Sequence, residues 1–548
     1  MEIETIKKLE KEALKKSGTD FARIGFALFF MIGVLTFSFL NNGGISNNMF
    51  LAVAALIGAY MAMNIGANDV ANNVGPAVGS KAMTMTTAII IAAVFEASGA
   101  LIAGGEVVKT IKKGIIDISA FGGNADPFIW AMMAALLAAA LWLNFATSMK
   151  APVSTTHSIV GGVMGAGIAA AGFSIVDWGT MGKIAASWVI SPVLGGVIAA
   201  LFLYSIKKSI VFKEDKVKAA KTYVPIFVAI MSMAFVTYLT LKGLKKIWPQ
   251  IVETLNMLPL ISLEMTKKPS LLTALTFGLI VAVIVYSFVK AKISKNTTTL
   301  ENSKASVNTL FTIPLIFAAA LLSFAHGAND VANAIGPLAA INDAVVNGGI
   351  SSKASIPLWV MGVGALGIAL GLALYGPKLI RTVGSEITEL DQIRAFSIAM
   401  AASITVIIAS QLGLPVSSTH IAIGGVFGVG FLREWLHISD DTNTIEEDKL
   451  IIQDERENKE AYNAELKTLE NRADKSQEEY ARIVELYKLI ANEKRIIKST
   501  KKSIKKAQKV QYVKRDAIKK IVAAWVITVP AAATLAGVLF FMIKGIMA

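Results

Sequence analysis

The chain has 548 residues, of which 54% are hydrophobic and 17% are charged, and its mean hydropathy is +0.59. A soluble protein of this length exposes more charge, so the composition predicts a multi-pass protein of the lipid bilayer. The net charge of +14 does not require nucleic acid, because much of it lies in short loops that orient spans. No cysteine is present, which excludes disulfides and thiolate metal sites.

The first 49 residues are expected to form an amphipathic helix followed by an extra span near 24–40. Residues 1–20 alternate acids and bases at helical spacing. A secretory signal would have a short basic region and a small-residue cleavage site, and neither is seen. We therefore expect an uncleaved span whose N-terminus lies in the cytoplasm, in the inner (plasma) membrane.

Twelve further stretches are apolar enough to cross a bilayer, alone or as broken helices. They lie near 50–72, 84–106, 128–148, 152–172, 184–205, 223–241, 271–290, 309–333, 357–376, 393–412, 415–432 and 519–545. Several contain glycine and proline, and such breaks are tolerated only inside protein or beside a water-filled cavity. The predicted fold is an all-α polytopic membrane protein with broken or re-entrant helices.

Two motifs occur twice. GANDVANNVGP at 66–76 returns as GANDVANAIGP at 327–337, and PVSTTHSIVGG at 152–162 returns as PVSSTHIAIGG at 415–425. A third pair, Trp188 and Trp525, is 337 residues apart, whereas the second motif is 263 apart. About 74 residues are therefore inserted into the second half, as expected for a repeat architecture with one interrupted copy.

The repeat and the insertion divide the chain into six expected parts. These are an N-terminal segment and extra span at 1–49, a first transport repeat at 50–205, basic loops with two linker spans at 206–308, the first part of the second repeat at 309–432, a helical insertion at 433–518, and a final span at 519–548.

Basic loops predict the orientation. Lysine and arginine gather at 206–221, 291–308 and 494–520, a bias typical of the cytoplasmic side. The first repeat then starts outside and the second inside, so the two are inverted. Sites in inverted-repeat transporters lie near the midplane, at the interface of the repeats.

The insertion is charged, with 18 acidic and 21 basic residues in 433–520. Two heptad-like runs, Tyr462, Leu466, Leu469, Ala473 and Tyr480, Val484, Tyr487, Ile490, flank a turn at 471–476. We expect a cytoplasmic antiparallel hairpin, with a polybasic exit against anionic lipid head groups. It is either a solvated scaffold or a regulatory or oligomerising element.

The first motif is expected to bind coupling cations through side chains at matching positions: Asn68, Asp69, Asn72, Asn329, Asp330 and Asn333. A carboxylate at bilayer depth costs roughly 2.5–3.5 kcal/mol on insertion scales unless it is paired or hydrated. On a helix the three side chains share one face and, with carbonyls freed by neighbouring glycines, supply an all-oxygen shell that suits sodium. Helix capping and a proton relay stay open as alternatives.

The second motif supplies six hydroxyls for one tetrahedral oxyanion: Ser154, Thr155, Thr156, Ser417, Ser418 and Thr419. Each copy places proline and hydroxyls before a small-residue helix, whose first N–H groups lack intrahelical partners and favour an anion. No arginine lies in either motif, so the positive charge would come from helix termini and bound cations. That dependence would couple the two motifs. Ordinary capping is the alternative.

Three further polar residues are considered as accessory groups: Glu96, His157 and His420. The two histidines follow the hydroxyls at matching points, and they either make a structural hydrogen bond or serve anion contact or proton handling. Glu96 has no evident partner in the second half, and His326 breaks the symmetry because the first half has Ile65 there. No cluster has zinc-ligand spacing, so no transition metal is expected.

With its duplicated GANDVAN and PVS(S/T)TH segments, the sequence resembles the inorganic phosphate transporter (PiT) family, which includes sodium–phosphate symporters and retroviral receptors. The resemblance covers about 50–205, 309–432 and 519–545. It implies an inverted-repeat carrier in which Asn68, Asp69, Asn329 and Asp330 serve cations and the six hydroxyls hold phosphate. Glu96 matches the acid of the family's FE-x-(S/T)-G segment. The extra first span and the insertion depart from the family pattern.

The expected function is import of inorganic phosphate by cation-coupled symport with alternating access, with sodium favoured over protons as the coupling ion and no other cofactor. A sulfate or other oxyanion permease of the same fold, an anion channel, and a membrane scaffold or sensor built on the hairpin are the alternatives. No nucleophile–base constellation or nucleotide loop is present, so no enzyme is expected. A homodimer is one oligomeric state to be tested.

Overall fold

The structure is a computed structural model, and every regular element among the residues that it describes is a helix. The described residues are 2–45, 48–149, 153–245, 247–257, 264–296, 300–349, 356–386, 390–472, 476–507 and 515–547. Within them, β-pairing is limited to an isolated bridge between Ile116 and Val176. The expectation of an all-α polytopic membrane protein is confirmed.

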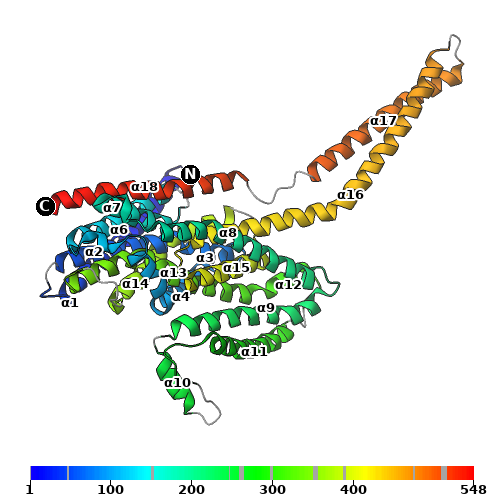
Figure 1. The fold of residues 1–548 in the computed structure, drawn as a ribbon. Coiled ribbons are helices and arrows are strands. Elements are labelled where there is room, and N and C mark those ends of the chain that lie inside the picture. Colours follow the sequence, from blue (N-terminus) through cyan, green and yellow to red (C-terminus); the bar gives the residue numbers. More distant parts are fainter. Residues whose placement is uncertain are drawn as a thin grey trace. The chain divides into compact units, whose positions relative to one another are not determined.

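The helices follow one another along the chain as shown in Figure 1. Their bounds are α1 (Glu2–Asn41), α2 (Asn48–Asn68), α3 (Val70–Gly79), α4 (Met85–Ala103), α5 (Gly105–Lys113), η1 (Ile118–Phe121), α6 (Ala125–Ser148), α7 (Thr155–Ala171), η2 (Phe173–Ile175), α8 (Trp178–Ile206), η3 (Lys207–Val211), α9 (Lys216–Tyr238), η4 (Leu239–Gly243), α10 (Trp248–Asn256), α11 (Leu271–Asn296), α12 (Lys304–Leu310), α13 (Thr312–Val346), α14 (Leu358–Glu386), α15 (Gln392–Gln411), α16 (Ser418–Glu470), α17 (Gln477–Ala507) and α18 (Arg515–Met547).

Eleven stretches of described helix are long and apolar enough to cross a membrane. Two expected spans, near 152–172 and 415–432, are not among them. The first corresponds to α7, which has only 17 residues, and the second is the start of α16, a single helix of 53 residues that runs on into the charged insertion. Short α7 and the start of α16 carry the two hydroxyl motifs.

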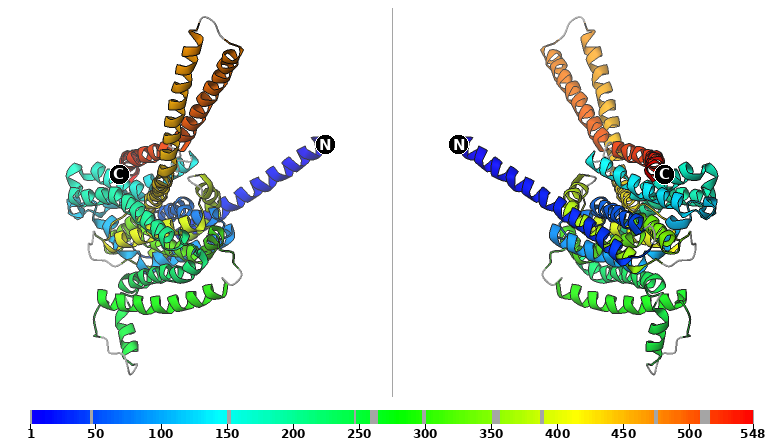
Figure 2. Two further views of the ribbon diagram at one scale, coloured as in Figure 1. Left: turned by 90° about the vertical axis from the view of Figure 1, so that its right-hand side faces the viewer. Right: turned by 90° about the vertical axis from the view of Figure 1, so that its left-hand side faces the viewer.

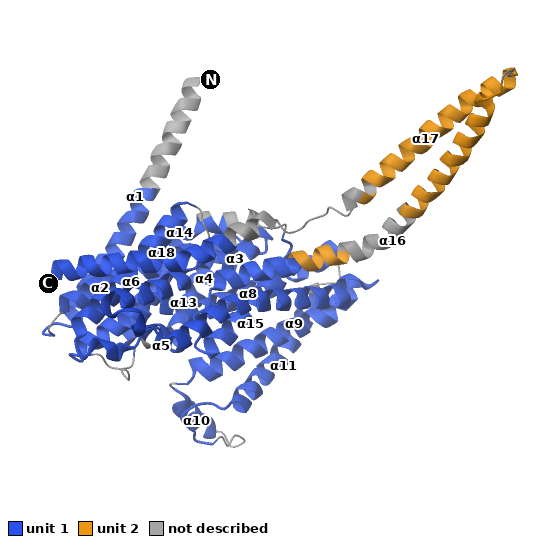
Figure 3. Cartoon of the chain, turned by 45° about the horizontal axis from the view of Figure 1, so that its top comes forward, with its two compact units in different colours: residues 1–429, 515–548 blue, residues 430–514 orange. Residues whose placement is uncertain are grey.

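The chain divides into two compact units, residues 1–429 with 515–548 and residues 430–514 (Figure 3). In the first unit α13 is the central helix, in contact with α2 to α7, α9, α12, α14 and α15, and it lies among these helices in Figure 1. Figure 2 gives two further views of the fold. Helix α13 is buried from Pro314 to Val345 along nearly all of its length. Its neighbours therefore enclose the polar residues of the second GAND motif together with the apolar ones.

Two helix crossings, α2 with α14 and α13 with α4, both depend on a glycine at the point of closest approach. A Cβ on Gly66 of α2 would lie 1.9 Å from the carbonyl oxygen of Ile368 on α14. A Cβ on Gly327 of α13 would lie 2.1 Å from the carbonyl oxygen of Glu96 on α4. Gly66 and Gly327 are the first residues of the two GAND motifs, so these glycines bring helices together in the manner of small-residue membrane interfaces.

The second unit contains an antiparallel pair, the later part of α16 and α17, which pack through Leu466, Leu486 and Ile490. Arg482 bridges Glu465 at 2.8 Å and lowers the pKa of that carboxyl by donating hydrogen bonds to it. The face predicted for α17 is partly wrong, because Tyr480, Val484 and Tyr487 are exposed, whereas Ile483 and Leu486 pack inward. The contact with α16 decides which face of α17 packs inward. The spacing of apolar residues along α17 is compatible with either the predicted face or the observed one. The predicted position Ala473 lies outside the described residues.

Candidate functional site

The first motif lies at a one-residue helix break in the first half and inside an unbroken helix in the second. Asp69 stands between α2 and α3 with helical dihedral angles (φ −85°, ψ −33°), whereas Asp330 lies within α13. The expectation of carbonyls freed by neighbouring glycines is therefore wrong for the second copy. Gly327 is needed there for the close approach of α4, and the helix continues through it.

The second motif begins α7 in the first half and α16 in the second. Ser154 accepts a hydrogen bond from the His157 N–H at 3.1 Å, and Ser417 accepts one from the His420 N–H at 3.3 Å. Both serines are thus helix caps, as the capping alternative predicts for these two residues. Each accepts a hydrogen bond from a backbone N–H that the start of a helix leaves without an intrahelical partner. The hydroxyls of Thr155, Thr156 and Thr419 do not cap these helices and donate to other groups instead. All the side chains predicted to bind cations or anion are at most 7% exposed.

Asp69 joins the two motifs and the two halves of the chain. One of its carboxylate oxygens accepts the hydroxyl of Thr155 at 2.6 Å, and the other accepts the hydroxyl of Thr419 at 3.1 Å. Thr155 belongs to the first half and Thr419 to the second, 350 residues away from Asp69. The segments predicted to bind cation and anion therefore touch one another, with a carboxylate at the junction.

Two asparagines cross between the halves in matching ways. Asn72 donates to Thr419 at 2.8 Å, and Asn333 donates to Thr156 at 3.1 Å and to Thr155 at 3.2 Å. Asn72 and Asn333 occupy equivalent positions of the first motif, and Thr156 and Thr419 occupy equivalent positions of the second. Each asparagine of one half thus binds the hydroxyl motif of the other, which gives the site an approximate two-fold pattern of hydrogen bonds.

The non-helical backbone before the second hydroxyl motif is supported by side chains. Four consecutive carbonyls, from residue 413 to 416, each accept a hydrogen bond, which removes the cost of burying them unpaired. The donors are Thr110 to Gly413 (2.7 Å), Asn329 to Leu414 (3.2 Å), Trp188 to Pro415 (3.1 Å) and Thr156 to Val416 (3.0 Å). Three of these donors belong to the first half, so the halves hold this segment together.

Asn68 and Asn329 anchor the two copies of the first motif to a neighbouring helix. Asn68 donates to the hydroxyl of Thr147 at 2.8 Å, and Asn329 donates to the hydroxyl of Ser410 at 2.9 Å. Asn329 also accepts the N–H of Val416 at 3.3 Å. Thr147 and Ser410 are 263 residues apart, the same offset as the hydroxyl motifs. Both asparagines thus spend amide donors on the scaffold, in addition to any ligand that they bind.

Asp330 has a different environment from Asp69. It accepts the hydroxyl of Ser418 at 3.3 Å, and its carboxylate lies 3.0 Å from Nε2 of His326. The other ring nitrogen of His326 lies 2.7 Å from Glu96, which also accepts a hydrogen bond from Asn73 at 2.7 Å. Glu96, without an evident partner in the sequence, is therefore bound from the second half by His326 and from its own half by Asn73.

His157 and His420 lie side by side, with ring centroids 4.7 Å apart. Each ring also packs on a tryptophan, His157 on Trp188 at 3.8 Å and His420 on Trp525 at 3.6 Å. No described residue makes a hydrogen bond to any of the four ring nitrogens. The structural hydrogen bond considered for these histidines is therefore absent from the described part of the chain. Aromatic packing, instead of a hydrogen bond, fixes the two rings.

Ligand atoms of Asp69, His326 and Asp330 lie within 4.8 Å of one another and could hold a metal ion. The carboxylate oxygens suit a hard cation, whereas an imidazole nitrogen suits transition metals. Two of the three groups already contact one another directly, because Nε2 of His326 lies 3.0 Å from the Asp330 carboxylate. This cluster therefore gives no separate reason to expect a transition metal. Its two carboxylates already belong to the oxygen-rich cation sites predicted from the motifs.

Sequence reasoning found the residues that are duplicated and missed those that are not. Glu96 and His326 carried a signal, since each is a polar residue unmatched in the other half, and the structure pairs them. The shared offset of Thr147 and Ser410 was a weaker signal. Asn73 carried the same signal as Glu96 and His326, since its counterpart in the second motif is Ala334. Nothing local marks Thr110, because its role depends on which segment packs against it.

Comparison with known proteins gives a consistent result. Residues 65–536 match the profile of the phosphate transporter family. A Helicobacter pylori protein named "Putative phosphate permease" is 50% identical over 98% of both chains. A Thermococcus kodakarensis protein of the same description is 38% identical over 70% of this chain and 89% of its own. A solved structure titled "The sodium-dependent phosphate transporter" superposes with a TM-score of 0.70 at 29% identity, covering 91% of this chain and 99% of that one.

Proposed function

This chain belongs to the phosphate transporter family, and from that membership we propose that it imports inorganic phosphate with sodium by alternating access. One observation carries the proposal: Asp69 of the GAND motif accepts hydroxyls from the hydroxyl motifs of both halves. Cation and anion ligands therefore meet at one buried point. The sodium dependence stated for the solved neighbour favours sodium over protons as the coupling ion.

In this proposal each half contributes a cation site. Asp69 with Asn68 and Asn72 forms one, and the other is formed by equivalent residues of α13, namely Asn329, Asp330 and Asn333. Carboxylate and amide oxygens are the ligands that hard cations prefer. The 0–1% exposure of the two aspartates supports this role, because buried carboxylates require a compensating charge.

Hydroxyl protons supply the coupling. A hydroxyl has one proton and can donate it to one acceptor at a time. In the structure Thr155 and Thr419 donate to Asp69. Sodium bound at Asp69 would compete for the same oxygens, so these protons become available to phosphate, and a cation at Asp330 would release the hydroxyl of Ser418 in the same way. Cation binding then strengthens anion binding, and the anion strengthens cation binding by the same factor.

Alternating access follows if the two halves are inverted in the membrane. The contacts from Asn72 to Thr419 and from Asn333 to Thr156 support this arrangement. Each contact becomes the other when every residue is replaced by its counterpart in the other half. Sites of inverted-repeat carriers lie between the repeats, and each repeat gates one side. His157 and His420, one from each hydroxyl motif, place their rings 4.7 Å apart, so this contact also joins the two halves.

Uptake of labelled phosphate into proteoliposomes tests the function. A sodium gradient alone is expected to drive accumulation above equilibrium, and a pH gradient alone is not. Excess sulfate is expected to compete poorly, because phosphate can donate a proton to a carboxylate and sulfate is an acceptor only. Downhill flux without accumulation would indicate a channel, and strong competition by sulfate would indicate a broader oxyanion permease; either result would contradict the proposal.

We also propose that the N-terminus and the 433–520 insertion are cytoplasmic and that the carrier sits in the inner membrane. The chain lacks cysteine, so a single introduced cysteine can report sidedness. Tyr480→Cys, at an exposed position of the hairpin, is expected to resist an impermeant maleimide in intact cells and to react after lysis. Labelling in intact cells would reverse the orientation. Light scattering of the purified protein would decide whether it is a homodimer.

A further inference from the structure

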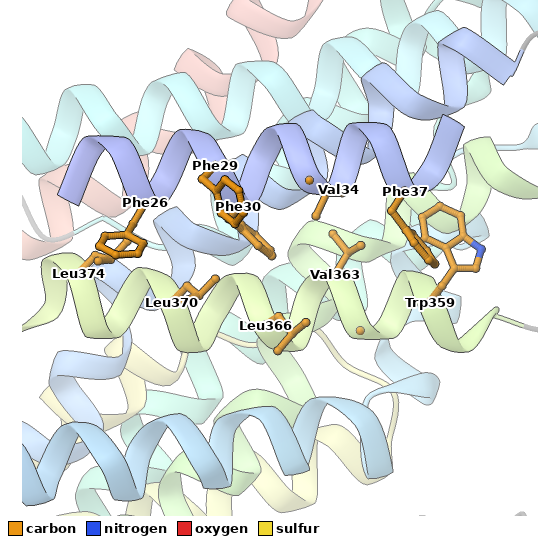
Figure 4. A pocket seen from close by; sticks show the side chains of 12 residues that line it. Phe26, Phe29, Phe30, Val34, Phe37, Trp359, Val363, Leu366, Leu370 and Leu374 are labelled. Atoms are coloured by element: carbon orange, nitrogen blue, oxygen red, sulfur yellow. The ribbon is translucent and has the colours of Figure 1, made fainter. Parts of the chain in front are cut away.

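A crevice lies between α1 and α14, outside the site described above (Figure 4). It has a volume of about 780 Å³, within the range of pockets that hold small ligands. Its walls are apolar: Phe26, Phe29, Phe30, Gly33, Val34 and Phe37 of α1 and Trp359, Gly362, Val363, Leu366, Leu370 and Leu374 of α14. Walls without charges exclude an ion or a polar solute, whose desolvation they could not offset.

Two glycines keep this crevice open. A Cβ added to Gly33 or to Gly362 would meet nothing within 4 Å. At the neighbouring crossing of α2 and α14, a Cβ on Gly371 would lie only 2.0 Å from the carbonyl oxygen of Met63. Gly33 and Gly362 are therefore not needed for helix packing. Their effect is to leave room beside the deep-lying Val34 and Val363, which are 8% and 6% exposed.

The length of the crevice matches one leaflet of a bilayer. Eleven residues separate Phe26 from Phe37, which on a helix is about 16 Å. The hydrocarbon core of a bilayer is about 30 Å thick, so the crevice covers roughly half of it. Figure 4 shows Phe37 beside Trp359 at one end, and their rings lie 6.3 Å apart. This aromatic pair bounds the crevice at that end.

Charged and polar groups mark the opposite end, where Figure 4 places Phe26 beside Leu374. Arg23 lies one helical turn before Phe26, and Tyr375 follows Leu374, within electrostatic range of Arg23. Arg23 contacts Asp20 at 3.3 Å, but both side chains are about half exposed, so this pair is weak. A guanidinium has five N–H donors, and most remain for a phosphate group. Tyrosine and arginine are typical of the head-group level.

From these features we propose that the crevice between α1 and α14 binds one acyl chain of an anionic membrane phospholipid, whose phosphate contacts Arg23. The apolar walls take the chain, the aromatic pair bounds it at one end, and Arg23 contacts the phosphate at the other. Filling the crevice couples α1 to α14, the helix that packs closely on α2 of the first motif.

Fluorescence quenching by lipid tests this. The protein would be placed in phosphatidylcholine vesicles containing phosphatidylglycerol brominated on its acyl chain. The signal of Trp359 is the difference between wild type and Trp359→Phe. We expect strong quenching of Trp359 in wild type and its loss in Gly362→Leu, where leucine fills the crevice. Gly25→Leu, on α1, in open space but outside the lining of the crevice, is the matched control and should keep the quenching. Arg23→Gln should abolish the preference for brominated phosphatidylglycerol over brominated phosphatidylcholine.

Equal quenching of Trp359 in wild type and Gly362→Leu would overturn the proposal. So would an unquenched Trp359 in a wild-type dimer that Gly362→Leu converts to a monomer, since a second copy would then occupy the crevice. Replacing glycine by leucine raises helix propensity, so the variant should fold. Gly33→Leu, from the other wall, repeats the test independently. None of these outcomes depends on which solute the carrier transports.

Discussion

Two groups of three buried residues in the first unit occupy equivalent positions of the repeat, and one group is polar whereas the other is aliphatic. In the first, Asn73, Glu96 and His326 form a hydrogen-bonded polar cluster with exposure of 0–1%. In the second, the matching residues are Ala334, Ile368 and Ile65, all buried. Equivalence follows from the two glycine crossings, where Gly327 meets the backbone of Glu96 and Gly66 meets that of Ile368.

The difference shows that the fold does not need the polar cluster. Aliphatic side chains fill the same position on the other side, and burying charged groups is often no more favourable than burying such side chains. The polar cluster is instead connected to the site, because His326 also contacts Asp330. Asp69 accepts hydrogen bonds from two threonine hydroxyls, whereas Asp330 accepts one from a serine hydroxyl and lies 3.0 Å from a ring nitrogen of His326. The two proposed cation sites are therefore unequal in spite of nearly identical motifs.

Replacing His326 by the residue of the other half should have the largest effect. His326→Ile leaves the Glu96 carboxylate buried with Asn73 as its remaining described contact, and removing one partner of a buried pair costs about 3–5 kcal/mol. The free energy of unfolding in detergent measures this. The control Ile65→Val, at the position equivalent to His326, should cost only about 0.5–1.5 kcal/mol. Similar losses in both variants would show that the cluster is not a charged pair.

Neutralising the aspartates comes next. Asp69→Asn should lower sodium-driven phosphate uptake on the order of 100-fold, equivalent to about 2.7 kcal/mol, the scale of a hydrogen bond or contact to a charged group. Asp330→Asn should lower it less, because His326 already shares the charge of Asp330. Uptake normalised to protein abundance measures both. Unchanged sodium dependence in both variants would remove these residues from the cation sites.

The paired asparagines should differ by a smaller amount. Asn329 bonds Ser410, Leu414 and Val416, whereas Asn68 bonds Thr147. Asn329→Ala should cost about 1–3 kcal/mol of stability and Asn68→Ala about 0.5–1.5 kcal/mol.

A double-mutant cycle checks this assignment. Asn68→Ala combined with Thr147→Val should show less than additive loss, because the two residues share one hydrogen bond. Asn68→Ala costing more than Asn329→Ala would reverse the order that the contacts imply.

Converting the whole polar cluster into its apolar counterpart should change stability least. The triple variant Asn73→Ala, Glu96→Ile and His326→Ile replaces a satisfied buried network by aliphatic groups, and we expect a free energy of unfolding within about 1 kcal/mol of wild type. The sodium dependence of uptake should change, because Asp330 loses its histidine. A loss as large as that of His326→Ile alone would show that the cluster is structural.

Much of the site could be predicted because it is duplicated. Two motifs in apolar sequence identify Asp69, Asp330 and the hydroxyls without any knowledge of packing. The helix break at Asp330 was expected and is absent, because Gly327 serves a crossing with α4 that the local sequence does not reveal. The bond from Glu96 to His326 spans 230 residues. Such a pairing is set by tertiary packing, so spacing along the chain cannot give it.

Equilibrium binding of phosphate to the purified protein, with and without sodium, tests the central claim most directly. Because cation and anion ligands share the Asp69 carboxylate and its hydroxyl donors, sodium should tighten the binding of phosphate, and phosphate should tighten the binding of sodium by the same factor. That mutual effect should be lost in Asp69→Asn. A phosphate Kd that is the same in sodium and in a sodium-free buffer, for wild type and variant alike, would contradict the account.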